Sequence, residues 1–192
     1  MYRQPKAYEE YVIVLDYLPY GYYTPRGFIR GPLAQAVGED YFMLLELQPY
    51  EGIPLSIRER VYVGKHDISK VRRITRRLTY DELTQTAKGE LPEVIEEIVT
   101  RKAEKFVEFF NKASPLTTRM HSLELLRGVG KKTLWKILEE RKKRPFESFK
   151  DIQERTRISD PKRLIVERIL EEIKGGQKYY LFVVPPPVRK RF

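Results

Sequence analysis

The first third of the chain alternates short apolar runs with turn-forming stretches. Apolar and β-branched residues concentrate at residues 11–15, 41–47 and 60–63, and these three runs predict short strands. The stretches between them are rich in proline, glycine and tyrosine, which predicts turns. Several short strands separated by long turns are typical of a small closed sheet. We therefore expect residues 1–78 to form a Greek-key barrel, with an OB-like β-barrel as the first choice.

The pattern changes to helical spacing after residue 78. Thr79 and Glu82 have the spacing of a capping box and predict a short helix through Ala87. Pro92 suits the first turn of a longer helix, which we expect to end near Asn111 because its apolar residues recur on one side. Residues 79–112 are thus expected to form connecting helices.

Residues 116–141 carry the most informative pattern. Apolar residues recur at helical spacing on both sides of the tight turn Gly128-Val129-Gly130 and predict two short helices with one apolar face each. The two glycines allow a sharp turn and the close approach of another backbone. This arrangement resembles the helix-hairpin-helix motif of nucleic-acid proteins, although Arg127 stands where members of that superfamily often have proline.

A second pair of helices is expected after this hairpin. Ser148 and Asp151 have capping-box spacing and predict a helix start, and the apolar positions of residues 161–173 predict another helix. The turn between them, residues 157–161, lacks the two glycines. We therefore expect residues 113–176 to form a tandem helix-hairpin-helix region whose second unit is degenerate and has lost its phosphate site.

The last part of the chain, residues 177–192, is expected to form a strand and a basic tail. Residues 178–184 are apolar and aromatic, which predicts a strand that returns to an edge of the barrel, and Arg189, Lys190 and Arg191 make the end basic. The predicted fold class is therefore α+β: a small N-terminal OB-like β-barrel, then an all-helical helix-hairpin-helix domain with a C-terminal strand.

Composition narrows the classes of function. With 41% hydrophobic and 33% charged residues and no apolar run near the ~20 residues of a membrane span, the chain should be a soluble globular protein. The start has no apolar signal segment, so we expect a cytoplasmic protein without a membrane partner. The absence of cysteine excludes disulfides, thiolate nucleophiles and cysteine-ligated metals. No cofactor is expected beyond a monovalent cation that the hairpin at Gly128 and Gly130 could hold.

Positive charge is confined to one part of the chain. The net charge is +10, yet residues 1–64 hold 6 Lys and Arg against 8 Asp and Glu, whereas residues 65–192 hold 31 against 19. A basic balance in the part that contains the hairpin indicates a polyanionic partner, most plausibly nucleic acid. The alternative is a merely solvated surface, because many glutamates are interleaved with the lysines.

The hairpin supplies the main candidate site. The first N–H groups of its second helix lack helical partners and suit a phosphate oxygen, while lysines add full charges beside them. The candidate phosphate-binding residues are Arg127, Gly128, Val129, Gly130, Lys131, Lys132, Thr133 and Lys136. The alternative is a plain helical hairpin with a glycine turn.

Two clusters in the barrel region are further candidates. Residues 17–31 place several tyrosines and a phenylalanine beside Arg26 and Arg30, the combination with which OB barrels stack single-stranded bases. These rings could instead pack the mouth of the barrel or a domain junction. A second cluster, with Arg72, Arg73, Arg76 and Arg77, belongs either to a basic helix or to a last strand, and could equally be a solvated face.

Trp135 is the single tryptophan of the chain and lies in the second helix of the hairpin. We expect it to be buried, since it continues the apolar face. An exposed position would instead make it an anchor for a partner.

Several segments together resemble the archaeal domain-of-unknown-function family 655. The resemblance rests on YVIVLDYLPYG, PLAQAVGEDYFMLLEL, RVYVGK, YDELT, FVEFFNKA and LELLRGVGKKTLWKILEERKKRPFESFKDI, which span most of the chain. It implies an OB-like barrel joined to a helix-hairpin-helix region in a nucleic-acid-binding protein. Genes of this family tend to lie near translation and transcription genes, which slightly favours RNA over DNA. The residues themselves leave that choice, and the oligomeric state, open.

The function expected from these observations is non-catalytic, largely sequence-independent recognition of the phosphate backbone of RNA or DNA. One alternative is an enzyme similar to base-excision glycosylases and lyases, in which Lys132 would attack the sugar and Asp151, 19 residues later, would assist. Against it, Asp151 already has a place as a helix cap, there is no cysteine cluster, and the chain before the hairpin is expected to be a barrel rather than the helical domain that forms a base pocket. The other alternative is a protein-protein interaction module in a ribonucleoprotein, translation or repair complex.

Overall fold

The computed structural model describes residues 7–66 and 68–188. The chain divides into two compact units. One contains the residues up to Val94 together with those from Glu171 onward, and the other is Ile95–Leu170. The basic end expected at Arg189, Lys190 and Arg191 lies outside the described residues.

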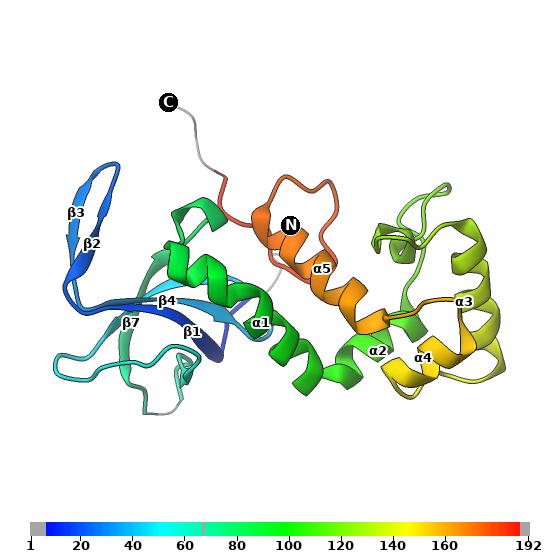
Figure 1. Cartoon of the computed structure of the whole chain (residues 1–192), viewed down its shortest axis with the longest axis horizontal. Coiled ribbons are helices and arrows are strands. Elements are labelled where there is room, and N and C mark those ends of the chain that lie inside the picture. The colour runs from blue at the N-terminus through cyan, green and yellow to red at the C-terminus, as the bar shows by residue number, and fades with distance from the viewer. Residues whose placement is uncertain (1–6, 67, 189–192) are drawn as a thin grey trace, which may run out of the picture. The chain divides into compact units, whose positions relative to one another are not determined.

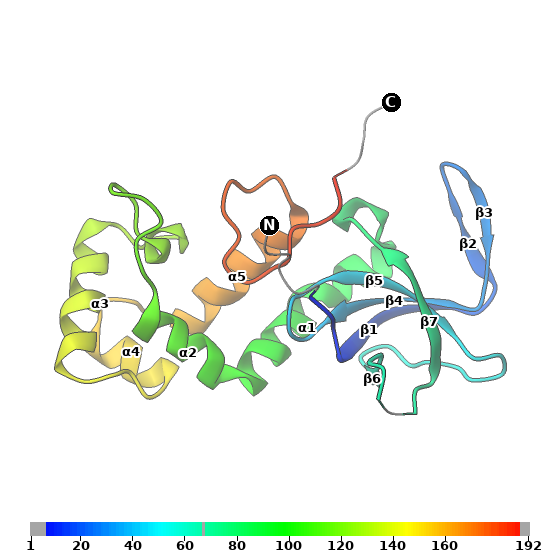
Figure 2. The same cartoon turned by 180° about the vertical axis from the view of Figure 1, so that it is seen from behind.

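A five-stranded antiparallel sheet, in the order β6-β1-β4-β5-β7, forms most of the first unit. Its strands are β1 (Tyr11–Leu18), β4 (Leu33–Gly38), β5 (Leu44–Pro49), β6 (Arg60–Tyr62) and β7 (Val71–Arg77). The sheet curls into a half-barrel, which Figures 1 and 2 show from opposite sides. Shifts of register in the β1–β4 and β5–β7 pairs bend it further. The predicted α+β class is confirmed.

Two strands of this sheet differ from the sequence-based expectation. β5 begins at Leu44 rather than at residue 41, because Phe42 has a φ of +53°, outside the extended region. β4 has no predicted counterpart; its sequence LAQAVG is poor in β-branched residues but is buried along its whole length. The sequence left open whether the arginine cluster forms a helix or a strand. Its four arginines lie in the strand β7.

One face of the sheet carries a core cluster of the first unit. In β1, Val12 and Val14 point into this core, while Ile13 and Leu15 are buried on the other face. The strand is therefore apolar on both faces. The core cluster consists of Val12, Val14, Ala34, Ala36, Met43, Leu45, Leu47, Leu55, Val61 and Val71.

Buried polar side chains attach the start of the first helix to the sheet. The Gln35 amide is fully buried; its oxygen accepts the Thr84 N–H at 2.8 Å and its nitrogen donates to the Glu82 carbonyl at 3.0 Å. The Thr84 hydroxyl also donates to the Asp16 carboxylate at 2.6 Å. These bonds satisfy groups that burial would otherwise leave unpaired. The predicted Thr79–Glu82 capping box is present and caps the 3-10 turn η1 (Tyr80–Glu82).

Helix α1 (Gln85–Arg101) begins before Pro92 and passes through it. The expectation that Pro92 opens this helix is therefore wrong. A proline inside a helix costs about 3 kcal/mol, because it lacks the N–H for one bond and crowds the preceding turn. Burial on both sides of it offsets this cost, since Leu91, Val94 and Ile95 are at most 1% exposed and each contributes about 1.5 to 3 kcal/mol.

The segment expected to be a turn-rich loop contains a separate hairpin, β2 (Gly21–Thr24) and β3 (Gly27–Arg30). Gly21 and Gly27 have φ values of +93° and +120°, which glycine adopts without strain. In Figure 1 this hairpin projects from the five-stranded sheet.

The second unit is helical. It contains the end of α1, then α2 (Ala103–Lys112), the 3-10 turn η2 (Ser122–Leu125), α3 (Lys131–Lys143), α4 (Phe149–Arg155) and most of α5 (Pro161–Lys174). The predicted start of α4 is confirmed, with the Ser148 hydroxyl accepting from the Asp151 N–H. The element before the glycine turn is only the short η2 rather than a full helix, since Leu116 and Met120 lie outside it and are more than one third exposed.

The C-terminal strand expected at residues 178–184 is not formed; none of the described residues 177–188 belongs to a strand. The Glu172 carboxylate accepts the N–H groups of Leu181, Phe182 and Val183 at 2.7 to 3.0 Å, so these amides cannot serve a sheet. The segment still reaches the first unit's sheet region, because the Val184 N–H donates to the Tyr41 carbonyl.

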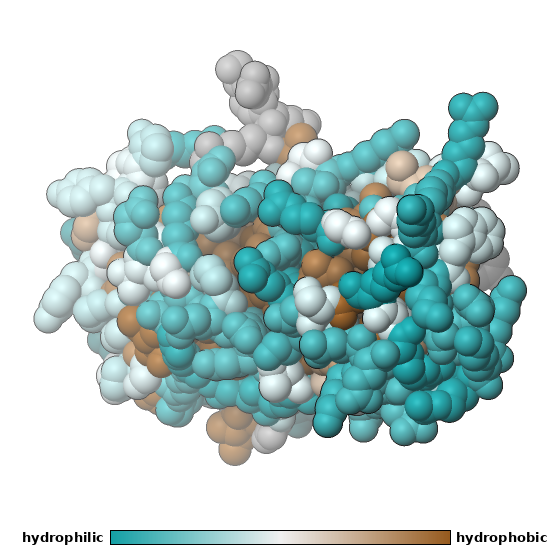
Figure 3. Space-filling model, turned by 45° about the vertical axis from the view of Figure 1, so that its right-hand side comes forward, coloured by the Kyte–Doolittle hydropathy of each residue, from teal (hydrophilic) through white to brown (hydrophobic). Residues whose placement is uncertain are grey.

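No helix in the described part of the chain is long and apolar enough to cross a membrane. Hydrophilic side chains also dominate the face shown in Figure 3, where hydrophobic areas lie between them.

Candidate nucleic-acid interface

The turn between η2 and α3 depends on its two glycines in different ways. Gly128 has a φ of +81°, which disfavours any other residue, whereas Gly130 is extended with φ −88° and ψ −175°. An added Cβ would meet no atom within 4 Å at either position. Val129 between them is 5% exposed, and its N–H donates to the Leu126 carbonyl. Val129 therefore fixes the turn while both glycines present bare backbone to solvent.

Helix α3 begins without a side-chain cap. Gly130 is its N-cap residue, and the first backbone bond of the helix runs from the Leu134 N–H to the Gly130 carbonyl at 2.9 Å. Among the described residues nothing accepts the N–H groups of Lys131, Lys132 and Thr133. Unpaired N–H groups at a helix start carry partial positive charge and attract anions. This end of α3 can therefore hold a phosphate oxygen.

The cations around this end differ in how free they are. Lys131 donates to the Glu124 carboxylate at 2.8 Å and to the Arg119 carbonyl at 3.2 Å. Lys136 forms an ion pair with Glu140 at 2.9 Å. Lys132 and Arg127 are exposed and have no partner among the described residues. Lys132 and Arg127 are thus the charges most available to an incoming phosphate.

Farther along α3, the Glu140 carboxylate pairs with several cations. Hydrogen bonds from Lys143 and Lys136 lower the pKa of the Glu140 carboxyl to about 2. Arg155 approaches the same carboxylate at 3.6 Å. These lysines therefore neutralise a carboxylate of their own chain, and Lys136 contributes less to an anion site than its sequence position indicates.

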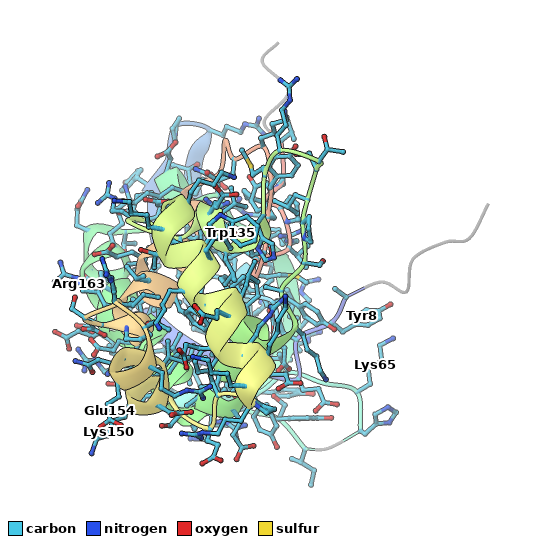
Figure 4. The ribbon with its side chains drawn as sticks, turned by 90° about the vertical axis from the view of Figure 1, so that its right-hand side faces the viewer. Tyr8, Lys65, Trp135, Lys150, Glu154 and Arg163 are labelled. Carbon is cyan, nitrogen blue, oxygen red and sulfur yellow. The ribbon has the colours of Figure 1, made fainter. Side chains whose placement is uncertain are left out.

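Trp135 is 66% exposed, so the expectation that it is buried is wrong. Successive residues of a helix are rotated by about 100°, and Leu134 and Ile137 occupy the buried side of α3. Figure 4 looks onto α3 with Trp135 on its outer side. A helical wheel centred on these two residues would have placed the indole outside the core.

The second hairpin, between α4 and α5, differs at the start of its second helix. Its helix α5 starts at Pro161, which has no N–H, and the Asp160 carboxylate accepts the Arg163 N–H at 3.0 Å. A carboxylate of the chain itself thus occupies the position that is open at α3. The first turns of α3 and α5 therefore differ in whether a side chain of the chain itself accepts their N–H groups.

Lys132 and Asp151 do not approach each other. Asp151 pairs with Arg144 at 3.1 Å and with Arg155 at 2.9 Å, next to the C-terminal end of α3. Lys132 is the second residue of that helix, so about 17 Å of helix separates the two ends. The Asp151 carboxylate also accepts the Glu147 N–H at 3.1 Å, and together these partners hold the pKa of Asp151 below its usual range despite the opposing effect of burial.

Strand β7 supplies two exposed and two engaged arginines. Arg72 and Arg73 are exposed, and Arg73 donates to the Gln48 side chain at 2.8 Å. Arg76 donates to Glu82 at 2.8 Å and to Tyr22 at 3.2 Å, and although burial opposes it, the bond to Glu82 raises the pKa of Arg76. Arg77 donates to the carbonyls of Val184 and Pro185. Arg76 and Arg77 therefore have structural partners within the protein.

The β2–β3 hairpin exposes aromatic rings next to a hollow. Tyr20 and Tyr23 are 86% and 84% exposed, and the Tyr23 ring lies 4.9 Å from that of Phe28. Tyr22 is the exception, since its hydroxyl donates to the buried Glu46 carboxylate. A hollow of about 820 Å³ lies between this hairpin and η1, and the exposed Arg26 lines it. Arg30 at the end of β3 is exposed as well.

Comparisons with known proteins identify the family. A family model described as "Protein of unknown function (DUF655)" matches residues 8–184. The chain belongs to this family. An uncharacterised protein of Methanocaldococcus jannaschii is 44% identical over 182 residues, which is 94% of this chain and 82% of that protein. A crystal structure from Archaeoglobus fulgidus, described as a DUF655 member, matches with a TM-score of 0.81 and 51% identity over 92% of this chain and 100% of that one. The predicted family and its archaeal membership are confirmed.

Proposed function

We propose that this protein binds the phosphate backbone of nucleic acid, without catalysis and largely without sequence preference, at the N-terminal end of α3. The observation that carries the proposal is the contrast between the two hairpins. The end of α3 leaves the N–H groups of Lys131, Lys132 and Thr133 unpaired beside exposed cations, whereas Asp160 closes the matching end of α5. An uncapped helix end costs stability, and its retention next to Lys132 and Arg127 is explained by an anionic ligand.

The finer fold assignments belong to the same proposal. We interpret η2, the glycine turn and α3 as a helix-hairpin-helix unit, with α4 and α5 as its degenerate second copy. We interpret the curled sheet as an open OB-like barrel, because it has five strands and its outermost strands, β6 and β7, are not paired in the described sheet order. A monovalent cation at Gly128 and Gly130 stays a prediction.

Two other functions fit the geometry less well. A glycosylase or lyase needs its lysine and its carboxylate at one reacting centre. Lys132 lies at the start of α3, whereas Asp151 lies in α4 beside the other end of α3 and is held by two arginines. A protein-binding module would be favoured by a broad exposed apolar surface, whereas the exposed Trp135 shares the start of α3 with the exposed cations Lys131 and Lys132.

Exposed arginines and aromatic rings of the first unit form a second candidate region for contacts with nucleic acid. Arg26, Arg30, Arg72 and Arg73 are exposed there, with the rings of Tyr20, Tyr23 and Phe28. We propose that these residues assist binding, whereas Arg76 and Arg77 act within the fold. The resemblance described above slightly favours RNA as the partner.

The decisive experiment replaces Lys132, because Lys131 is a poor choice: Lys131→Glu would place a carboxylate against Glu124 and disturb the fold. Lys132→Glu should weaken binding of a short fluorescent RNA or DNA at least about tenfold, and should reduce the slope of log K against log salt by about 1. Fluorescence anisotropy over a range of salt concentrations measures both quantities.

The matched control is Lys150→Glu, which makes the same charge change at an exposed lysine of α4 (Figure 4). Its ion pair with Glu154 lies in solvent, so its loss costs little stability. A general effect of net charge would weaken both variants equally. The proposal fails if Lys132→Glu binds no more weakly than Lys150→Glu, or if the wild-type affinity does not depend on salt.

A further inference from the structure

Trp135 is the largest exposed apolar side chain beside the proposed phosphate site. It follows Lys131 and Lys132 by four and three residues, so its Cβ atom lies about 5 to 6 Å from that of each lysine on the surface of α3. None of the aromatic or cation–π contacts among the described residues involves Trp135. Its indole face is therefore free to accept a flat partner.

The surroundings of Trp135 indicate the chemistry of that partner. Lys131, Lys132 and Arg119 are exposed nearby; the Lys131 ammonium lies 3.2 Å from the Arg119 carbonyl. An apolar protein surface would have to desolvate Lys132, which has no carboxylate partner among the described residues, without compensation. A ligand that combines negative charges with flat rings would satisfy both the cations and the indole. Nucleic acid carries this combination in every nucleotide.

The geometry of stacking indicates whether the bound nucleic acid is single-stranded or double-stranded. In a duplex each base is already stacked on its neighbours, and its faces are closed to an outside ring, whereas an unpaired base can stack on an aromatic side chain. A helix side that offers phosphate-binding N–H groups at one turn and an indole face at the next can hold a phosphate and an adjacent unpaired base together.

We propose that Trp135 stacks on an unpaired base of the strand whose phosphate is held at the start of α3, so that the preferred ligand is single-stranded nucleic acid. This inference rests on the proposed function and adds the class of ligand to it. Stacking of one base on an aromatic side chain corresponds to about a 5- to 150-fold gain in affinity.

The test compares three ligands of equal length, about 12 nucleotides: an oligothymidylate, an abasic oligonucleotide with the same phosphates, and a duplex. Trp135→Ala should weaken binding of the oligothymidylate about 5- to 150-fold and leave binding of the abasic strand unchanged. Trp135→Phe, which keeps a smaller ring, should lose less. Because Trp135 is the only tryptophan, the oligothymidylate should also quench the intrinsic indole fluorescence of the wild-type protein, and the abasic strand should not.

The variants separate the two proposals. If Lys132→Glu weakens all three ligands while Trp135→Ala weakens none, the stacking inference is overturned and phosphate binding stands. If Trp135→Ala weakens the abasic strand as much as the oligothymidylate, or the duplex binds more tightly than the single strand, the inference is also overturned. If neither variant changes affinity, both proposals fail. Loss of self-association in Trp135→Ala with unchanged binding would assign the indole to a second copy of the chain, again against the inference.

Discussion

Gly130→Asp should make the protein more stable and a weaker binder at the same time. Gly130 is the N-cap of α3, has the extended conformation that N-cap residues adopt, and has room for a Cβ. An aspartate there can accept one of the free N–H groups of the first turn. The variant thus copies onto the first hairpin the arrangement of Asp160 at the second.

The gain in stability is the sum of three small contributions. An aspartate cap is worth a few tenths of a kcal/mol over glycine. Its charge at the helix N-terminus adds about 0.3 to 1 kcal/mol. Replacing glycine reduces the entropy of the unfolded chain, which adds about 0.4 to 1 kcal/mol. The free energy of unfolding should therefore rise by about 1 to 2 kcal/mol, or about 2 to 4 °C in Tm for each kcal/mol in a chain of this size.

Binding should change in the opposite direction. The new carboxylate occupies the N–H groups and repels phosphate, so affinity for a short oligonucleotide should fall at least about tenfold. Urea unfolding followed by circular dichroism and fluorescence anisotropy measure the two effects on the same samples. Asp160→Gly is the matched control, since it should lose a similar stability at α5 and leave binding unchanged.

Two results would refute the reasoning. If Gly130→Asp is less stable than the wild type, the start of α3 is not an open helix end of the kind described. If the variant is stabilised but binds as the wild type does, the N–H groups are free yet do not hold the phosphate. Gly130→Asn separates the effect of occupying the N–H groups from that of the negative charge, because it caps without charge.

Two further predictions concern charged side chains that have partners within the protein. Glu140 has its pKa lowered to about 2 by Lys143 and Lys136, from an ordinary value of 4.5, so its contribution to stability is present above pH 4.5 and is lost as the pH falls towards 2. Glu140→Gln should remove that part of the pH dependence in urea titrations at several pH values, and an unchanged profile would contradict the assignment. Arg77→Ala should speed hydrogen exchange of the Val184 amide, because Arg77 holds the Val184 and Pro185 carbonyls, without changing oligonucleotide affinity. A loss of affinity as large as that of Lys132→Glu would contradict this prediction and would place Arg77 among the residues that bind nucleic acid.

The local elements with a chemical signature in the sequence were predictable. Ser148 marks the start of α4, Thr79 and Glu82 form their capping box, and the paired glycines 128 and 130 form a turn. In each case the determining interactions join residues at most four positions apart. Apolar runs likewise located β1 and β6, since a buried strand needs a continuous or alternating apolar pattern.

Other features depend on residues far apart in the chain. Pro92 lies inside α1 because burial around it outweighs the lost hydrogen bond, and residues 178–184 form no strand because Glu172 takes their N–H groups. β4 is a strand through its neighbours β1 and β5 rather than through its own composition. Propensity cannot register such contacts, because their energy arises only in the folded chain.

For the candidate site, the sequence by itself determined the glycine turn, the lysines after it and the missing glycines of the second hairpin. Only the tertiary structure decided which groups are free. It pairs Lys131 with Glu124 and Lys136 with Glu140, closes the start of α5 with Asp160, and turns Trp135 to the solvent. The physical reason is that the type and spacing of residues fix what a group can bind, whereas its availability depends on which partners and which side of the helix the folded chain gives it.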